Sequence, residues 1–240
     1  MLSVLNTLKS KFSGKQLSDL DLSKEDLNRI QNTILQRAPH DYYSREYQHM
    51  ERLYLPALFN ELRPFNPSSI LEIGPGWGTT ALWLKERGHD ITVMDLMPVG
   101  SFMTQEFINE LGIRYLHHDI EDTPFPESLS IPVFDIVIMT QVIPHLAWRP
   151  DRAIGHIASL LKGGGTFFTS VLDRPDNLNV EATFGDNWRD VPEWNTTEKC
   201  TDVVKCMYNE VTFRELIMTA FPEPNIWKPE ASTVLFANVK

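Results

Sequence analysis

What this sequence lacks excludes several classes of protein. It has only two cysteines, Cys200 and Cys206, too few for a disulfide framework or a four-ligand zinc site. It contains no run of about 18 apolar residues, so we expect no segment to span a membrane. Basic residues are also scarce. The 22 Lys and Arg against 32 Asp and Glu give a net charge of −10, which disfavours a general nucleic-acid binder. We expect a soluble, cytoplasmic protein.

Length and composition predict one globular domain with an N-terminal appendage. The chain has 240 residues, of which 42% are hydrophobic and 22% charged, and its 10% aromatic content is too high for a disordered chain. Ser23 followed by Asp26 resembles a capping box at the start of a helix. We expect residues 1–65 to form a helical extension that covers the site as a lid, and residues 66–240 to form the main domain.

From Ser69 onward, short apolar runs alternate with helical patterns. The predicted strands are residues 70–73, 91–94, 113–116, 133–139, 166–172, 225–227 and 233–239. The predicted helices between them are residues 77–87, 102–111, 152–161 and 212–221. This alternation predicts an α/β fold: a Rossmann-like, doubly wound, mostly parallel seven-stranded sheet with helices on both faces and an antiparallel C-terminal hairpin.

The most informative stretch is Glu72-Ile73-Gly74-Pro75-Gly76-Trp77-Gly78, where a predicted strand turns into a helix. Glycines at such a turn let the backbone reach positive φ and let a ligand lie against the main chain. A dinucleotide fingerprint needs a further glycine where this chain has Thr79, which disfavours an NAD-dependent enzyme. The Gly-Lys-Ser/Thr of a phosphate-binding P-loop is absent.

The sequence resembles the class I S-adenosylmethionine (SAM)-dependent methyltransferases in five motifs that occur in the same order. Their acid-x-Gly-x-Gly-x-Gly motif is matched by residues 72–78, and the acid that closes their second strand is matched by Asp95. The acid after their third strand is matched by Asp119. Residues 134–146 fit their fourth strand and its exit, and residues 160–165 fit the approach to the fifth strand. The resemblance covers about three-quarters of the chain.

The resemblance implies SAM as the cofactor and S-adenosylhomocysteine as its product. It assigns Asp95 to the ribose hydroxyls and Asp119 to the adenine amino group, although Glu121 and Asp122 lie close enough to make the adenine contact instead. Carboxylates accept hydrogen bonds from hydroxyls and amines, and an acidic pocket suits the sulfonium cation. The cofactor-binding residues implied are Glu72, Gly74, Gly76, Gly78, Asp95, Leu96, Asp119, Ile120 and Gln141.

Candidates for the chemical step lie after the fourth predicted strand. His145 is the predicted general base, because its pKa range suits proton removal at neutral pH; the alternative is that it binds a loop or caps the next helix. Gln141 stands where many relatives carry an acid and is a poor metal ligand, so we expect no metal and no magnesium-dependent catechol-type enzyme. Residues 141–144 also lack the Asp/Asn-Pro-Pro-aromatic tetrad of amino-group methylation.

Two segments are candidates for enclosing the acceptor. In the N-terminal extension, Tyr43 and Tyr47 could touch the substrate, or they could belong with Met50 and Tyr54 to an ordinary core stripe. The other candidate is a long polar insertion at residues 173–209. Its first thirty residues carry eight acids and three bases, which fits either a cationic substrate or a solvated acidic face. Its two tryptophans, Trp188 and Trp194, are predicted to stack on a ring of the substrate or to hold the insertion down.

These observations predict a SAM-dependent methyltransferase that acts on a small molecule, at oxygen rather than nitrogen. A sugar, a glycan precursor or a secondary metabolite would fit. The alternatives are a protein or RNA methyltransferase, which the acidic surface disfavours, and a non-catalytic SAM-fold subunit that stabilises a partner, which the intact cofactor motifs disfavour. A homodimer is compatible with the sequence.

Overall fold

The computed structural model describes residues 19–37, 45–96, 103–121, 133–146, 149–173, 208–229 and 232–240. Most of the 173–209 insertion lies outside these ranges, as do Tyr43, Asp122, Trp188 and Trp194. The described residues contain no helix long and apolar enough to cross a membrane.

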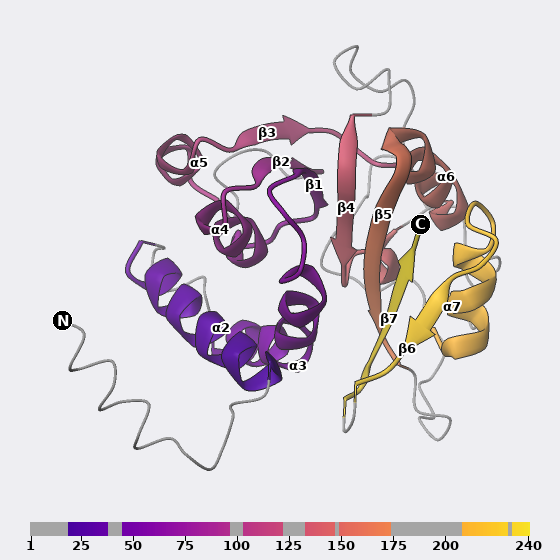
Figure 1. Cartoon of the computed structure of the whole chain (residues 1–240), viewed down its shortest axis with the longest axis horizontal. Coiled ribbons are helices and arrows are strands. Elements are labelled where there is room, and N and C mark those ends of the chain that lie inside the picture. Colours follow the sequence, from indigo (N-terminus) through magenta and orange to yellow (C-terminus); the bar gives the residue numbers. More distant parts are fainter. Residues whose placement is uncertain are drawn as a thin grey trace.

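A seven-stranded sheet forms the centre of the domain (Figure 1). Its strands are β1 (Ser69–Ile73), β2 (Asp90–Asp95), β3 (Arg114–His117), β4 (Phe134–Thr140), β5 (Leu161–Leu172), β6 (Asn225–Trp227) and β7 (Val234–Val239). They are ordered β3-β2-β1-β4-β5-β7-β6. The first five of them pair in parallel, whereas β7 is antiparallel to both β5 and β6. The predicted doubly wound sheet with an antiparallel C-terminal hairpin is therefore confirmed.

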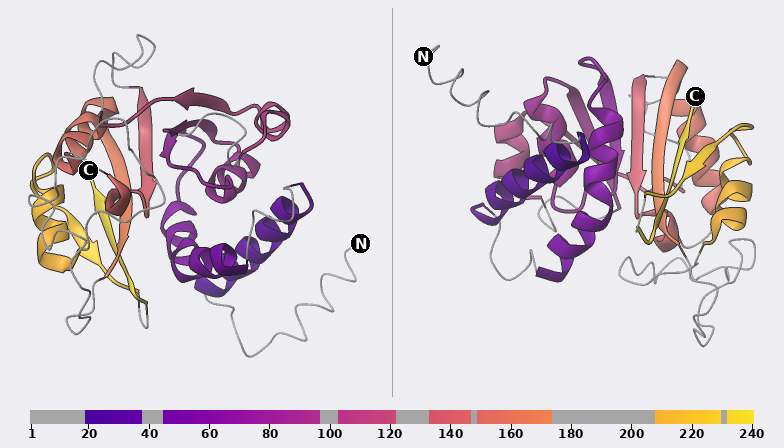
Figure 2. Two further views of the ribbon diagram at one scale, coloured as in Figure 1. Left: turned by 180° about the vertical axis from the view of Figure 1, so that it is seen from behind. Right: turned by 60° about the horizontal axis from the view of Figure 1, so that its bottom comes forward.

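Helices cover both faces of the sheet (Figures 1 and 2). They are α2 (Asp19–Leu35), α3 (Arg45–Leu62), α4 (Thr79–Glu86), α5 (Gln105–Leu111), α6 (Pro150–Leu160) and α7 (Glu210–Ile217), with a short 3₁₀ helix, η2 (Ile143–His145). Two apolar cores result. One joins α2, α3, α4 and α5 to the sheet, and the other joins α6 and α7 to the opposite face.

Local sequence explains where several of these helices begin. The Thr104 side chain accepts a hydrogen bond from Phe107 N at the start of α5. Asn209 and Thr212 form a capping box at the start of α7. Each cap provides a partner for a backbone N–H group that the helix itself leaves unpaired.

The predicted capping box at Ser23 and Asp26 is wrong, because α2 begins earlier, at Asp19. Ser23 is instead buried, and its hydroxyl accepts a hydrogen bond from Arg63 at 3.0 Å. Asp26 binds Arg63 and Arg87 and accepts a hydrogen bond from the indole of Trp83. These two polar residues therefore fasten α2 to α3 and α4.

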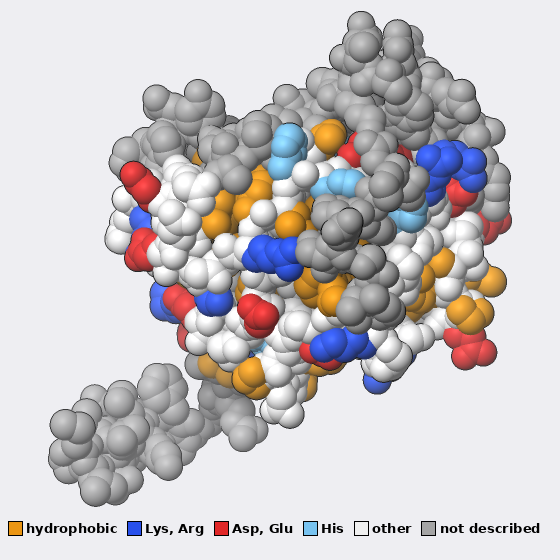
Figure 3. Space-filling model, turned by 90° about the horizontal axis from the view of Figure 1, so that it is seen from above, with side chains coloured by type: hydrophobic (Ala, Val, Ile, Leu, Met, Phe, Trp, Pro, Cys, Tyr) orange, Lys and Arg blue, Asp and Glu red, His pale blue; other side chains and the backbone are white. Residues whose placement is uncertain are grey.

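Figure 3 shows the molecule from above the view of Figure 1. On this face, acidic and basic side chains lie interspersed with apolar ones, and the described residues form no broad basic patch.

Candidate active site

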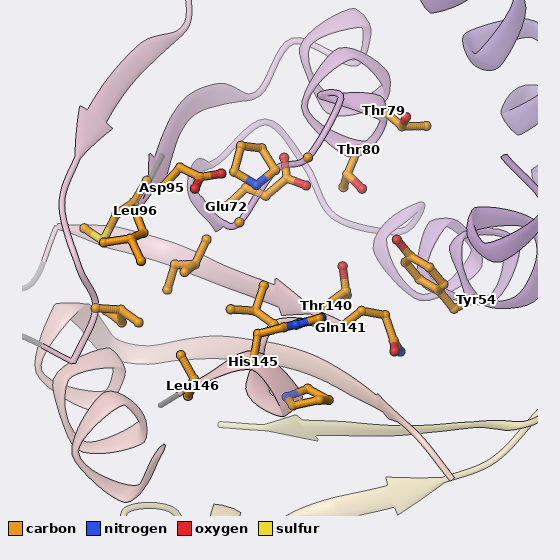
Figure 4. A pocket seen from close by; sticks show the side chains of 18 of the residues that line it. Tyr54, Glu72, Thr79, Thr80, Asp95, Leu96, Thr140, Gln141, His145 and Leu146 are labelled. Atoms are coloured by element: carbon orange, nitrogen blue, oxygen red, sulfur yellow. The ribbon is translucent and has the colours of Figure 1, made fainter. Parts of the chain in front are cut away.

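A cavity of about 570 Å³ lies at the carboxyl ends of β1, β2 and β4 (Figure 4). β1 lies between β2 and β4. The chain adds β2 and β3 on one side of β1 and then returns to add β4 and β5 on the other side. Doubly wound folds bind their ligands in the crevice at such a switch point. The predicted site residues that line the cavity are Tyr47, Glu72, Gly74, Gly76, Asp95, Leu96, Asp119, Ile120, Gln141 and His145.

The glycine loop forms the floor of the cavity through backbone conformations that other residues avoid. Gly74 and Gly76 have φ values of 65° and 52°. A Cβ atom at Gly74 would overlap the side chain of Val142, and one at Gly76 would overlap the Tyr47 hydroxyl. Gly78 does not line the cavity. It is the N-cap of α4, and its missing Cβ makes room for Met103, whose Cε would lie 2.8 Å from an added Cβ.

Glu72 is a buried carboxyl group at the end of β1, with 3% of its surface exposed. It interacts with the Thr80 side chain and the Ala81 backbone. Its Oε2 atom has no hydrogen-bond partner among the described residues. Burial, and to a smaller extent the nearby carboxylates of Glu51 and Asp95, raise the pKa of Glu72 to about 8.

Asp95 and Leu96 continue the cavity wall where β2 ends. The Leu96 carbonyl lies 2.8 Å from His117 Nε2, and the amide of His118 donates to the Asp95 carbonyl. These bonds fix the chain just beyond β2 and β3. His118 itself lines the cavity on this side.

Asp119 and Glu121 both line the cavity next to Ile120. Asp119 Oδ1 accepts a hydrogen bond from the Glu121 amide at 2.9 Å, and Glu121 Oε1 accepts one from the Arg149 amide at 2.7 Å. The choice between Asp119 and Glu121 for the adenine contact therefore stays a prediction, with Asp119 favoured by the resemblance.

The exit of β4 places two polar side chains on the opposite wall. Gln141 has a φ of 59°, a conformation that non-glycine residues rarely adopt and that is often found at functional sites. Two hydrogen bonds to Ser170 hold Gln141 in place. Its backbone N–H donates to the Ser170 carbonyl, and its side-chain Nε2 donates to the Ser170 hydroxyl at 3.0 Å. His145 follows on η2, and Figure 4 shows it across the cavity from Glu72 and Asp95.

The N-terminal helix α3 closes the cavity with one face. Tyr47, Met50, Glu51 and Tyr54 line it together. The Tyr47 ring packs edge-on against Trp77, at 6.3 Å between centroids, and its hydroxyl interacts with the Trp77 backbone. Burial and the carboxylates around it raise the pKa of Tyr47. Tyr47 and Tyr54 therefore line the cavity and also pack in the apolar core, whereas Met50 lines the cavity but is exposed.

Glu51 is the residue that sequence reasoning missed. It is one of three acids in α3, with Glu46 and Glu61, and it belongs to no motif. Its position in the sequence could have indicated its place in the site, because Glu51 follows Tyr47 by four residues and therefore lies on the same face of the helix.

The site fits a cationic ligand. Five carboxyl groups line the cavity, whereas none of the described lining residues is Lys or Arg. SAM supplies a methyl group on a positively charged sulfur when bound. Asp95 would hold its ribose and Asp119 its adenine, as the resemblance implies, and the Cβ-free surface of Gly74 and Gly76 leaves space for it against the main chain.

A doubly wound sheet with a glycine loop after β1 and acids at the ends of β1 and β2 defines a SAM-dependent methyltransferase. The comparison with protein families agrees: residues 45–220 match the family described as a methyltransferase domain. The chain belongs to this family, and SAM is its cofactor.

Two curated relatives illustrate the range of this similarity. Tenellin synthetase of Beauveria bassiana is 29% identical over 183 residues, which are 72% of this chain but only 4% of that protein. The ubiquinone biosynthesis O-methyltransferase of Paramagnetospirillum magneticum is 23% identical over 70% of this chain and 69% of its own length.

Solved structures share the fold at lower identity. The protein PH0226 of Pyrococcus horikoshii has a TM-score of 0.59 and 15% identity over 86% of this chain and 97% of its own. The 1,6-didemethyltoxoflavin-N1-methyltransferase of Burkholderia thailandensis, solved with its substrate and S-adenosylhomocysteine, has a TM-score of 0.56 and 18% identity, covering 94% and 91% of the two chains.

Proposed function

We propose that the domain transfers a methyl group from SAM to an oxygen atom of a small, largely apolar acceptor. The observation that carries this proposal is the division of the cavity into two walls. The acids come from the ends of β1 and β2, from the chain after β3 and from α3, whereas the wall formed by β4 and η2 presents His145 and Gln141. The remaining lining is mostly apolar and includes Met50, Tyr54, Leu55, Val142, Leu146 and Leu172.

This lining favours one of the predicted acceptor classes. A sugar would leave many hydroxyls facing apolar side chains, and a buried hydroxyl without a partner is costly. An apolar secondary metabolite with one or two hydroxyl groups would match both the apolar side chains and the two polar ones. The name of the Paramagnetospirillum relative also specifies oxygen methylation, which supports the same choice of atom.

The chain's own residues would contribute mainly through position. Holding an acceptor in line with the methyl group can supply about 7–11 kcal/mol of the barrier reduction. Gln141 would orient the acceptor hydroxyl through its amide, and the imidazole of His145 would take the proton as the oxygen attacks. The apolar side chains would exclude water from the attacking atom.

A matched pair of acceptors tests the choice of atom. The purified protein would be incubated with methyl-labelled SAM and a set of aromatic phenols, each paired with the aniline of the same ring. Labelled product from phenols alone is the expected result. Label on the anilines alone would contradict oxygen methylation. Label only on added protein or RNA, or on nothing while the cofactor binds, would instead favour the macromolecular or the non-catalytic alternative.

A further inference from the structure

Helix α3 contributes a buried acid to the cofactor side of the cavity. Glu51 is 3% exposed. Its Oε1 accepts a hydrogen bond from the Thr79 hydroxyl at 2.6 Å, and its Oε2 accepts one from Gln31 Nε2 at 2.8 Å. Thr79 is the first residue of α4, and Gln31 lies in α2. These bonds hold the Glu51 carboxyl at the place where α2 and α3 meet the end of the glycine loop.

Glu51 lies close enough to Glu72 to affect its charge, and the Glu72 carboxyl group has one oxygen without a hydrogen-bond partner among the described residues. The two side chains line the same cavity and interact electrostatically. Glu72 is almost fully buried, yet its Oε2 atom has no hydrogen-bond partner in the described part of the chain. A buried carboxylate without a partner is costly, so this atom indicates a ligand that donates hydrogen bonds or carries positive charge.

The order of groups along the cavity identifies which part of the cofactor would lie here. The resemblance assigns adenine to Asp119 and ribose to Asp95. In Figure 4, Glu72, Thr80 and Thr79 follow Asp95 in that order toward Tyr54. The amino-acid end of the cofactor therefore comes next to Glu72, and its cationic group is the α-ammonium.

We propose that Glu51 is a further cofactor-binding residue, which forms with Glu72 a two-carboxylate recess for the α-ammonium group of SAM and of S-adenosylhomocysteine. An ammonium group has three donors, enough for Glu72 Oε2 and a second carboxylate. Since the proposal concerns only the donor side, it is independent of whether the acceptor atom is oxygen or nitrogen.

Binding of an ammonium group in this recess should release the proton of Glu72. At pH 7 Glu72 is mostly protonated in the free protein, because its pKa is about 8. An ammonium group beside it favours the carboxylate and expels the proton. The titratable groups around Glu72 are Glu51 and Tyr47 on α3 and Asp95 on β2, with His118 and His145 lining the same cavity. Of these, the Glu51 carboxylate raises the pKa of Glu72 more than the Asp95 carboxylate does.

Titration calorimetry with two probes tests the proposal. S-adenosylhomocysteine carries the amino-acid group, whereas 5′-methylthioadenosine shares the adenosine and sulfur but lacks it. Glu51→Gln is expected to weaken the binding of S-adenosylhomocysteine about tenfold, because one charge-assisted contact is lost. The affinity for 5′-methylthioadenosine should not change. Glu61→Gln is the matched control, because it removes the same charge from the same helix but does not line the cavity. An equal loss for both probes, or no loss for either, would overturn the proposal.

The unmodified protein provides a second test that does not depend on the variant folding. Repeating the titration in buffers of different ionisation enthalpy counts the protons released on binding. Most of one proton should be released with S-adenosylhomocysteine at pH 7, and less at pH 7 in Glu51→Gln. Proton release of the same size with 5′-methylthioadenosine would contradict an ammonium site.

Discussion

Replacing Gly76 by alanine should destabilise the domain through two separable effects. Gly76 has a φ of 52°, and a Cβ atom at this φ costs about 1–2 kcal/mol. The new methyl group would also overlap the Tyr47 hydroxyl, and moving that ring out of its place against Trp77 adds about 1–3 kcal/mol. We therefore expect Gly76→Ala to lower the free energy of unfolding by about 2–5 kcal/mol.

The Tyr47→Phe background separates the two effects. It removes the overlapping oxygen, while the ring carbon Cζ would lie 3.2 Å from the new Cβ, a distance that a small shift relieves. In this background Gly76→Ala should cost only the backbone part, about 1–2 kcal/mol. Urea denaturation of the wild type, both single variants and the double variant measures the coupling. If the two substitutions add within about 0.5 kcal/mol, Tyr47 does not pack on Gly76 and the described closure by α3 is wrong.

Three further predictions concern single side chains. Asp95→Ala should weaken SAM at least tenfold by calorimetry, the loss of one charge-assisted hydrogen bond, whereas Asp90→Ala at the exposed start of the same strand should not. His145→Ala should lower kcat and leave S-adenosylhomocysteine affinity intact; full activity from pH 6 to 8 would rule out its role as base. Ionising Glu72 in the fold is unfavourable, since its pKa is raised from 4.5 to about 8. Without ligand, Glu72→Gln should therefore become more stable relative to wild type as pH rises from 5 to 8, with no further gain above pH 9, and a constant difference in chemical denaturation would refute the raised pKa.

The sheet could be predicted because its signals are local. β1, β2 and β4 are apolar runs that are buried over most of their length, and each is followed by a helical pattern, whereas β3 is short and partly exposed. Where a predicted strand boundary was wrong, pairing with a neighbouring strand determines where the strand begins. Gly163, Gly164 and Gly165 were expected to precede a strand that starts at Thr166, but β5 begins at Leu161. The register against β4 shifts between Phe134 and Ile136, so the triplet forms an irregularity inside the strand.

Several residues that line the cavity could also be predicted, because a glycine loop and strand-end acids leave a pattern in one sequence. Glu51 leaves none, since its role depends on α3 packing over the loop and on partners 20 and 28 residues away. The positive φ of Gln141 is equally invisible in the sequence, because the neighbouring strand imposes it through Ser170.

We infer that the acids at the ends of β1 and β2 form a SAM site. Thermal unfolding with saturating SAM, S-adenosylhomocysteine or NAD tests it most directly. At 100 times the dissociation constant a ligand adds about 2.7 kcal/mol, which should raise the Tm by about 5–10 °C. We expect this rise with both sulfur compounds and none with NAD. No rise with either sulfur compound, or a rise with NAD alone, would contradict the account.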